Sequence, residues 1–362
     1  MRILLLGEFS ALHKYLKEGL ENIGHEVDLA SDGDRGKDID GQTLTLFEYD
    51  KSQYKVRLNR GWHIYKSIKK HITDFEDYDI VQMIHPIIFP TPVNYHFIKK
   101  IKEKNGTLCL ACAGLDYANA LAYKNGRYRY YAYDYEASPL NRYFASTFAA
   151  KLECKVERKV VSLVDKLIPY CWQYYIPYEK DPRCTNILPM PININTLPYI
   201  ENVVRDRIVI LHGLNREKEK GTPIIREALE RVQQRYPNKV EVIIDGHMPL
   251  RDYQRLMSRA NIVIDQCTSG GYGMGTLQAM ALGKVVCADC WPEFLAPIGI
   301  TPEEFPGIII SNTSTSIYEG ICKVIERGSD YIRELGHKAR IYAEQKHDYK
   351  KIADNFLSAA GK

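Results

Sequence analysis

Short apolar runs alternate with amphipathic stretches along most of the chain. Runs rich in Ile, Leu and Val predict buried strands at 2–6, 26–30, 79–84, 107–111, 165–169, 207–211, 240–244, 262–264 and 284–287. Apolar residues at helical spacing predict helices at 11–23, 93–104, 147–163, 223–235, 250–260, 276–282, 331–345 and 349–360. Strands that alternate with helices are typical of parallel sheets covered on both faces. The pattern therefore predicts an α/β chain with doubly wound sheets.

The length of the chain favours two domains. At 362 residues it exceeds the size of one ordinary hydrophobic core. Three prolines, Pro189, Pro191 and Pro198, interrupt the pattern between the two series of strands and mark a linker. We therefore expect one domain over 1–198 and a second over 199–345.

The composition is that of an ordinary globular protein, with 45% hydrophobic and 26% charged residues. No apolar run is long enough to predict a membrane-spanning helix, and the opening MRILLLGEF reads as a first strand rather than a signal peptide. We expect a cytoplasmic location. The net charge of +4 is mild, so no nucleic-acid partner is expected.

Nine cysteines include two pairs at CxxC spacing, Cys109/Cys112 and Cys287/Cys290. A zinc site made from both pairs is conceivable. Each pair lies in or beside a strand-like run, where residues i and i+3 face opposite sides. Buried thiols are the favoured interpretation, and we expect no metal site.

The most informative stretch runs from Asn261 to Ala288, NIVIDQCTSGGYGMGTLQAMALGKVVCA. It predicts a strand, a loop containing four glycines (Gly270, Gly271, Gly273 and Gly275), a helix and a second strand. Glycines before a helix let backbone N–H groups approach an anion, and the helix N-terminus favours negative charge. The loop is therefore either a diphosphate cradle or a turn that needs glycine for close packing.

This stretch resembles the donor-site signature of glycosyltransferase family four, retaining enzymes with the GT-B fold. That family shows Glu-Gly-Phe-Gly, four residues, then Glu-Ala-Met-Ala-x-Gly. The corresponding runs here are Gly270-Gly271-Tyr272-Gly273 and Gln278-Ala279-Met280-Ala281-Leu282-Gly283, so both acidic positions differ. The resemblance implies two Rossmann-like domains that face each other across a cleft, with residues 346–362 forming a helix that crosses back to the first domain.

The same resemblance assigns roles in binding the donor. In the family the first acidic residue contacts the donor sugar, and Gly270 occupies its position here. The second acidic residue of the family binds the nucleotide ribose. Gln278 occupies that position, and its amide can still hydrogen-bond ribose hydroxyls. The backbone from Gly271 through Tyr272 and Gly273 to Met274 would hold phosphate and sugar.

The run from Gly213 to Gly221 resembles the family's diphosphate-binding segment, in which an Arg follows a Gly and a Lys-Gly pair comes later. Lys220-Gly221 matches that pair, and Arg216 stands in for the arginine. Two cations beside a helix N-terminus would stabilise the charge that develops on a leaving diphosphate. The alternative is a solvated charge run. We expect Lys220 and Arg216 to be catalytic and Gly213 to line the site.

The first domain contributes candidates for the acceptor side. The loop after the first strand carries Gly7 and Glu8, at the place where the family contacts its acceptor. Asp116 follows the strand at 107–111 and matches an Asp of the family, so we expect it to be catalytic, against the alternative of a turn-forming Asp. The tyrosine-rich segment 123–143 covers the cleft or fills the core.

Residues 57–72 combine lysines and arginines with an apolar stripe. An ordinary amphipathic helix packed on a sheet is the favoured interpretation. The alternative is a patch that contacts an anionic membrane surface, at the inner face of the plasma membrane, and receives a lipid-linked acceptor.

Together these features predict a retaining, metal-independent glycosyltransferase without a cofactor. It would move a sugar from a nucleotide-sugar donor, UDP- or GDP-linked, to a saccharide or lipid-linked acceptor in bacterial surface polysaccharide or glycolipid synthesis. The alternative is a non-catalytic protein of the same fold that binds a sugar nucleotide or a partner transferase. A sugar-nucleotide epimerase shares the fold but requires acid/base carboxylates and histidines in the cleft.

Overall fold

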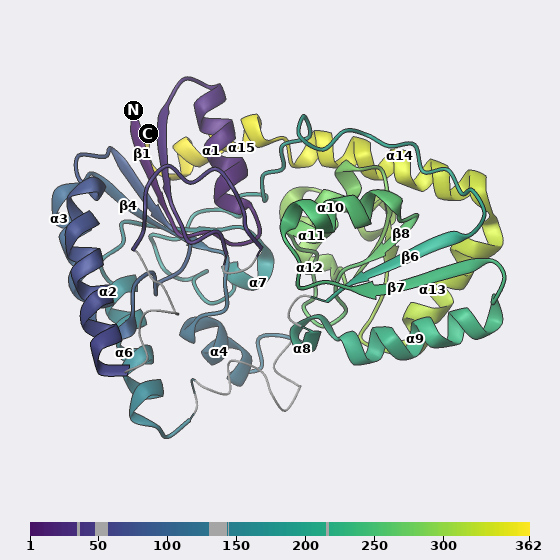
Figure 1. Cartoon of the computed structure of the whole chain (residues 1–362), viewed down its shortest axis with the longest axis horizontal. Helices are drawn as coiled ribbons and strands as arrows, with labels where there is room; N and C mark the ends of the chain where they lie inside the picture. The colour runs from purple at the N-terminus through teal and green to yellow at the C-terminus, as the bar shows by residue number, and fades with distance from the viewer. Residues whose placement is uncertain (35–36, 48–56, 130–142, 144, 215–216) are drawn as a thin grey trace.

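The structure is a computed structural model of the chain. It describes residues 1–34, 37–47, 57–129, 143, 145–214 and 217–362, with the backbone alone at 57–60 and 218–219. Two lobes lie side by side, and both chain termini lie together on the first lobe (Figure 1).

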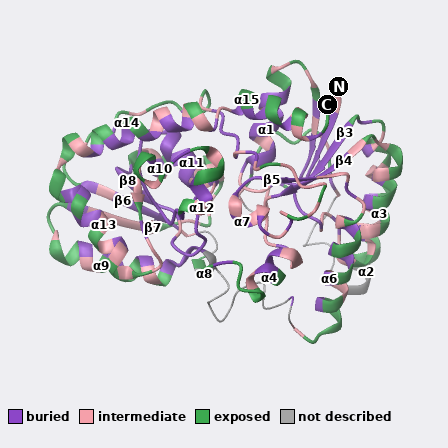
Figure 2. Ribbon diagram, turned by 180° about the vertical axis from the view of Figure 1, so that it is seen from behind, coloured by how far each residue is buried: buried purple, intermediate pink, exposed green. Residues whose placement is uncertain are grey.

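Within the described part of the chain, each lobe contains one sheet of five parallel strands. The strand orders are β2-β1-β3-β4-β5 and β10-β9-β8-β6-β7. In both sheets the first strand in the sequence lies between the second and the third, so each has one point where the winding direction reverses. The strands are buried and the helices expose their outer faces (Figure 2). The predicted α/β architecture of two doubly wound sheets is confirmed.

The first lobe follows the predicted order of elements closely. Its strands are β1 (Arg2–Leu6), β2 (Glu26–Ala30), β3 (Ile80–Met83), β4 (Thr107–Cys112) and β5 (Lys166–Pro169). Its helices are α1 (Leu12–Asn22), α2 (Arg57–His71), α3 (Thr91–Lys104), α4 (Tyr117–Lys124), α6 (Phe148–Val161) and α7 (Trp172–Tyr175), with a 3-10 turn η1 (Ile72–Phe75).

The second lobe repeats this alternation. Its strands are β6 (Ile208–Gly213), β7 (Val240–Asp245), β8 (Ile262–Ile264), β9 (Val285–Ala288) and β10 (Ile308–Ile309). Its helices are α8 (Glu217–Lys220), α9 (Thr222–Arg235), α10 (Leu250–Arg259), α11 (Met274–Ala281), α12 (Pro292–Leu295), α13 (Ser314–Arg327) and α14 (Ser329–Lys346), with 3-10 turns η3 (Ala296–Ile298) and η4 (Pro302–Glu304). The last helix of the chain is α15 (Tyr349–Ala359).

The helix predicted at 223–235 begins one residue earlier, at Thr222, and Gly221 is its N-cap. Gly221 has φ +76°, a left-handed conformation that glycine adopts without strain. A Cβ at this position would lie 2.5 Å from Cys267 Sγ, so the close approach of the β8 loop also requires glycine.

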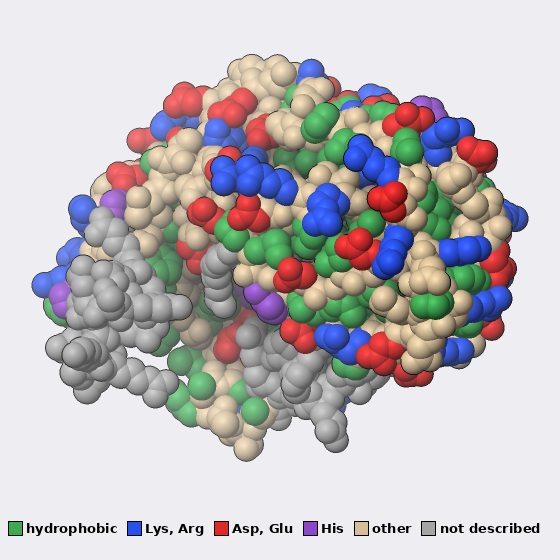
Figure 3. Space-filling view, turned by 45° about the vertical axis from the view of Figure 1, so that its right-hand side comes forward, with side chains coloured by type: hydrophobic (Ala, Val, Ile, Leu, Met, Phe, Trp, Pro, Cys, Tyr) green, Lys and Arg blue, Asp and Glu red, His purple; other side chains and the backbone are tan. Residues whose placement is uncertain are grey.

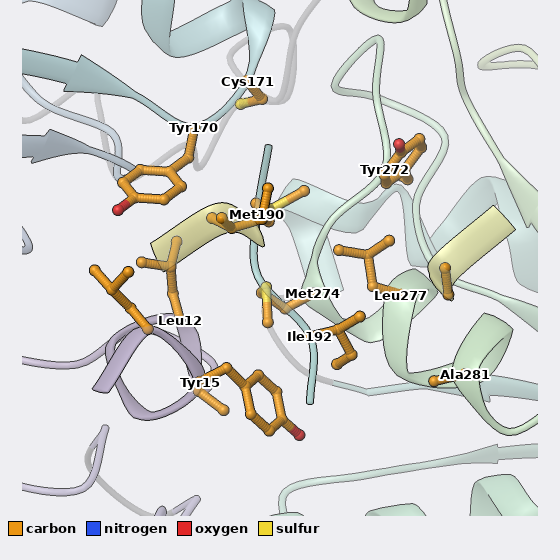
Figure 4. Packing of buried hydrophobic residues seen from close by; sticks show 14 of the residues in the cluster. Leu12, Tyr15, Tyr170, Cys171, Met190, Ile192, Tyr272, Met274, Leu277 and Ala281 are labelled. Carbon is orange, nitrogen blue, oxygen red and sulfur yellow. The ribbon is translucent and has the colours of Figure 1, made fainter. Parts of the chain in front are cut away.

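The two lobes share a hydrophobic core. α15 packs against α1, and the linker between β5 and β6 runs between α1 and α11 (Figure 4). Met190 and Ile192 of the linker belong to the same buried cluster as Leu12 of α1 and Leu277 of α11. The chain crosses between the lobes twice, first through this linker and again between α14 and α15. A β-bridge between Ile192 and Asp348 joins the two crossings. No helix among the described residues has the length and apolarity that a membrane crossing requires.

Candidate functional site: a buried lysine at the reversal point of the second sheet

The second sheet reverses its winding direction between β6 and β8, which are neighbours in the sheet. The loops that leave the carboxyl ends of these two strands pass to opposite faces, and proteins of this architecture commonly bind ligands between such loops. The first loop leads through α8 to Lys220, and the second begins at Asp265 and contains the glycines before α11. The predicted donor segments therefore meet at the place where α/β proteins commonly bind ligands.

Lys220 and Asp265 form a buried ion pair between these two loops. The ammonium Nζ lies 2.9 Å from Asp265 Oδ1, and the two side chains are only 9% and 6% exposed. The ammonium also lies 3.5 Å from the Gly213 carbonyl oxygen, and Thr276 Oγ1 donates to Asp265 Oδ2 at 2.9 Å. Lys220 is therefore held in place rather than extended into water, which excludes the alternative of a solvated charge for this residue.

The start of α11 faces the same carboxylate. Gly273 caps α11, and a Cβ on Gly273 or Gly275 would lie 3.5 Å or 3.2 Å from Asp265 oxygens. Positive charge from the helix N-terminus and from Lys220 therefore converges on one point. In this structure the chain's own Asp265 provides the negative charge at that point.

Gly270 and Gly271 have a different role. Gly270 has φ +71°, and a Cβ there would lie 2.5 Å from the Trp291 ring. A Cβ on Gly271 would lie 2.0 Å from the Phe294 ring. Glycine is required at both positions because the rings of Trp291 and Phe294 pack directly against the backbone there. For Gly270 and Gly271, the structure therefore agrees with the alternative of a turn that needs glycine for close packing. No longer side chain fits at Gly270 while Trp291 keeps this position.

Tyr272 and Met274 turn toward the contact between the lobes. Both side chains belong to the shared hydrophobic cluster (Figure 4). The Tyr272 hydroxyl lies 2.6 Å from Tyr342 Oη and 2.9 Å from His347 Nε2. The side chain of Tyr272 is therefore not directed at the Lys220 pair, and this residue could contact a donor there only through its backbone.

Gln278 lies one turn into α11 and is 2% exposed. Within the described part of the chain, the side-chain amide of Gln278 makes no hydrogen bond, while its backbone carbonyl oxygen accepts the helical bond from Leu282 N. A buried amide with free hydrogen-bonding capacity is compatible with the predicted ribose contact, which stays a prediction.

In the first lobe, Gly7 and Glu8 follow β1 at the reversal point between β1 and β3. Gly7 has φ +81°, and a Cβ there would lie 2.5 Å from Ile84. Glu8 is buried, and its carboxylate accepts from the backbone N–H groups of His13 at 3.3 Å and Lys14 at 2.8 Å. Burial raises the pKa of Glu8 to about 7. The carboxylate therefore binds the first turn of α1, and its predicted contact with an acceptor has no support in this geometry.

Asp116 is used in a comparable way. It caps α4, accepting from Asn119 N at 2.9 Å, and the Tyr178 hydroxyl donates to its second oxygen. Burial raises the pKa of this carboxyl above its ordinary value. Both oxygens have partners within the first lobe, as the turn-forming alternative supposes, so the predicted catalytic role is not supported by these contacts.

Aromatic rings of the two lobes meet at the contact between them. Trp172, just after β5, meets Trp291, after β9, with ring centroids 5.7 Å apart. Arg129 pairs with Glu293 across the same boundary and lies over the Trp291 ring. Because Trp172 and Trp291 both follow carboxyl ends of strands, these ends of the two sheets face each other.

Several predicted features lie outside the described residues: Arg216 and most of the tyrosine-rich segment, at 130–142. Among the described residues, no three His, Cys, Asp or Glu side chains come together as a metal site would require. On the face shown in Figure 3, basic and acidic side chains are interspersed rather than gathered by sign.

Sequence reasoning missed three residues of this region: Asp265, Trp291 and His347. Asp265 had an available signal, because a carboxylate directly after a buried strand lies at the ligand-binding edge of a parallel sheet. The contacts of Trp291 and His347 join segments distant in sequence, and no local pattern indicates them.

Comparison with known proteins gives a likeness of fold. No family model matches the chain, and no curated protein matches its sequence. Sucrose-phosphate synthase from Thermosynechococcus elongatus matches 99% of this chain and 98% of its own, at 14% identity and a TM-score of 0.62. WaaG, a glycosyltransferase involved in lipopolysaccharide biosynthesis, matches 99% and 98% at 15% identity and a TM-score of 0.60. Anabaena HepE in complex with UDP-glucose matches 100% and 99% at 13% identity and a TM-score of 0.61.

These likenesses extend over both lobes and the crossings between them, so they describe the arrangement of the whole chain rather than one shared sheet. The predicted architecture is thereby confirmed: the chain has the GT-B fold.

Proposed function

We propose that this protein is a glycosyltransferase that takes a sugar from a nucleotide-sugar donor. The observation that carries the proposal is the placement of Lys220: a buried ammonium beside the N-terminus of α11, where the second sheet reverses direction. The pyrophosphate of a nucleotide sugar is the anion that matches this combination of cation, helix N-terminus and backbone N–H groups. HepE, which shares the fold, binds UDP-glucose.

Negative charge would build up on the departing diphosphate as the bond to the sugar breaks. A preorganised cation in a water-poor site stabilises such charge more strongly than one in water. Lys220 would provide this cation and Gln278 would bind the ribose, while the backbone from Gly271 to Met274 would contact phosphate and sugar. Arg216 would add a second positive charge.

We further propose that the donor is UDP- or GDP-linked and that transfer proceeds with retention and without a metal ion or cofactor. The support is the family-four spacing of the glycine loop and of Lys220-Gly221. The acceptor would be a saccharide or a lipid-linked sugar of the bacterial surface, reached from the cytoplasm with a peripheral contact at the inner face of the plasma membrane. Recording the anomeric configuration of the product by NMR tests retention.

A non-catalytic protein is the second candidate, and the contact between Gly270 and Trp291 favours it. The family's first acidic residue touches the donor sugar, but the Trp291 ring leaves no room for a side chain here. A protein of this kind would bind the nucleotide without transferring or hydrolysing the sugar. Binding together with release of nucleoside diphosphate from a nucleotide sugar distinguishes the enzyme from this alternative.

A thermal-shift panel of UDP, GDP, ADP, CMP and their sugars tests the proposal. At one hundred times its dissociation constant a ligand adds about 2.7 kcal/mol to the free energy of unfolding. The double variant Lys220→Met/Asp265→Asn removes both buried charges together, so neither partner is left uncompensated.

The matched control is Lys284→Met. Lys284 is also buried, but it directly precedes β9 and therefore lies at the amino ends of the strands, opposite to the carboxyl ends where Lys220 lies. The proposal predicts stabilisation by one nucleotide class in wild type and in the control but not in the double variant. Stabilisation that persists in the double variant contradicts the assigned site.

A further inference from the structure

Tyr272 connects the glycine loop to the two crossings between the lobes. Its side chain is 2% exposed and packs against Phe294, with ring centroids 4.7 Å apart, and against Phe305 at 5.8 Å. Its hydroxyl reaches His347, the residue that follows α14 at the second crossing. His347 in turn contacts the first crossing, because its Nδ1 lies 2.8 Å from the Met190 carbonyl oxygen.

The direction of each hydrogen bond follows from its partners. The Met190 carbonyl only accepts, so His347 Nδ1 carries the proton and donates it. Burial lowers the pKa of His347 to about 4, so the ring is neutral at physiological pH and its Nε2 accepts. Tyr272 must therefore donate to His347, and Tyr342 donates to the Tyr272 oxygen at 2.6 Å.

The same place is where the two crossings are joined by their backbones. Ile192 N donates to the His347 carbonyl oxygen at 2.9 Å, beside the bridge from Ile192 to Asp348. A rotation of one lobe on the other bends the chain at these crossings, since they are the two covalent connections between the lobes. The Tyr272–His347 bond joins that bending segment to the loop.

The loop end of this connection lies next to the candidate donor site. Tyr272 precedes Gly273, the N-cap of α11, where an added Cβ would lie 3.5 Å from the Asp265 carboxylate that pairs with Lys220. We propose that Tyr272 is a positioning residue, which through His347 couples the glycine loop at the donor site to the crossings between the lobes. This inference rests on the proposed function for the identity of the ligand.

Three variants separate the connection from general packing. Tyr272→Phe keeps the buried ring and removes only the hydroxyl. His347→Asn keeps a donor to the Met190 carbonyl, since the amide nitrogen takes the place of Nδ1, but removes the acceptor for Tyr272. Tyr342→Phe is the matched control, because it also removes one buried hydroxyl yet leaves the Tyr272–His347 bond in place.

Amide hydrogen exchange measures the coupling in the full-length protein. Without ligand, Tyr272→Phe and His347→Asn should each raise exchange in peptides covering 266–276 about five- to tenfold, as loss of one buried hydrogen bond permits. Tyr342→Phe should leave those peptides close to wild type. An equal rise in all three variants would show that the Tyr272–His347 hydrogen bond has no effect beyond that of general packing. That result would overturn the inference.

The second arm adds UDP, or whichever nucleoside diphosphate the thermal-shift panel selects. In wild type and Tyr342→Phe, the nucleotide should slow exchange both in 266–276 and in the crossings at 187–193 and 345–349. In Tyr272→Phe the loop should still be protected and the crossings should not. Crossings protected as in wild type overturn the inference while the proposed function stands. If no nucleotide protects the wild-type loop, the proposed function fails and the coupling fails with it.

Discussion

Lys220 Nζ lies 2.9 Å from Asp265 Oδ1, and both side chains are almost fully buried. The site that would bind a diphosphate therefore already contains a negative charge. A donor carrying a pyrophosphate must either share Lys220 with Asp265 or displace this carboxylate from it. Since like charges repel more strongly at low dielectric, Asp265 sets how tightly the site binds an anion.

This relationship predicts the effect of Asp265→Asn. The amide keeps the shape of the side chain but removes the charge, so Lys220 becomes available to a phosphate. We expect UDP or GDP to bind about tenfold more tightly, equivalent to about 1.4 kcal/mol. Isothermal titration calorimetry measures the change.

Asp289→Asn is the control for Asp265→Asn. It also removes a buried carboxylate of the second lobe, one that accepts from Gly270 N at 2.8 Å. Tighter binding in both variants would indicate a general change of potential. Weaker binding in Asp265→Asn would show that this carboxylate is a direct contact of the donor.

The Gly270 contact with Trp291 predicts a loss of stability in Gly270→Ala. The substitution introduces a left-handed alanine, which costs about 1 kcal/mol, and a clash with a fixed ring, which costs a further 1–3 kcal/mol. Gly126→Ala isolates the first cost, because Gly126 has φ +69° and nothing lies within 4 Å of the added Cβ. Urea denaturation of both variants measures the difference, and equal losses would argue against the observed position of Trp291.

Glu8 predicts a pH dependence. Its pKa is about 7 in the folded protein because the carboxyl is buried, whereas the unfolded chain titrates near the ordinary value of 4.5. Between these values the folded protein holds a proton that the unfolded chain has released, so stability falls as pH rises. The stabilisation is present below about pH 4.5 and is lost as pH passes 7.

Over this pH window, the titration of Glu8 lowers the free energy of unfolding by roughly 3 kcal/mol. Glu8→Gln removes the titrating group and keeps the shape of the side chain. We expect wild type to lose stability relative to Glu8→Gln from pH 4.5 to 7 in parallel urea titrations. If the free energies of unfolding of wild type and Glu8→Gln differ by the same amount at every pH, Glu8 does not hold a proton in the folded protein.

The membrane alternative for α2 has a test of its own. Trp62 is 57% exposed, and the neighbouring Lys66, Lys69 and Lys70 are exposed as well. Attraction of a basic residue to an anionic bilayer contributes about 1 kcal/mol near the surface. Co-sedimentation with phosphatidylserine vesicles should therefore fall when the three lysines are changed to Ser, and again with Trp62→Ser. Phe148→Ser, at a ring that is 81% exposed on α6, should change nothing.

Local patterns explain why most strands were predictable. The apolar run at Arg2–Leu6 ends at Gly7 and the run at Ile262–Ile264 lies between Asn261 and Asp265, and both strands have the predicted bounds. α13 has apolar residues at helical spacing but was not predicted, whereas α2 begins at Arg57, within the stretch 57–72 for which an amphipathic helix was favoured. The strand β10 has two residues, too few to give any periodicity.

The candidate site was predictable only in part, for a physical reason. A sequence indicates which residue types follow a strand, as with Lys220 and the glycines, but not which contacts they make. Gly270 and Gly273 occupy the same loop, yet one accommodates an indole ring and the other faces a carboxylate. Asp116 and Glu8 are carboxylates at strand ends, and both bind backbone N–H groups of their own lobe. Such pairings depend on tertiary packing.

A crystal structure of the protein with UDP bound would show whether Lys220 binds the diphosphate of the donor. We expect a β-phosphate oxygen about 2.8 Å from Lys220 Nζ, a typical distance for a charge-assisted bond, beside the N-terminus of α11. Asp265 should then have turned away from the ammonium or share it with the phosphate. A nucleotide bound elsewhere, with the Lys220–Asp265 pair unchanged and no phosphate beside it, would rule out Lys220 as the diphosphate-binding residue.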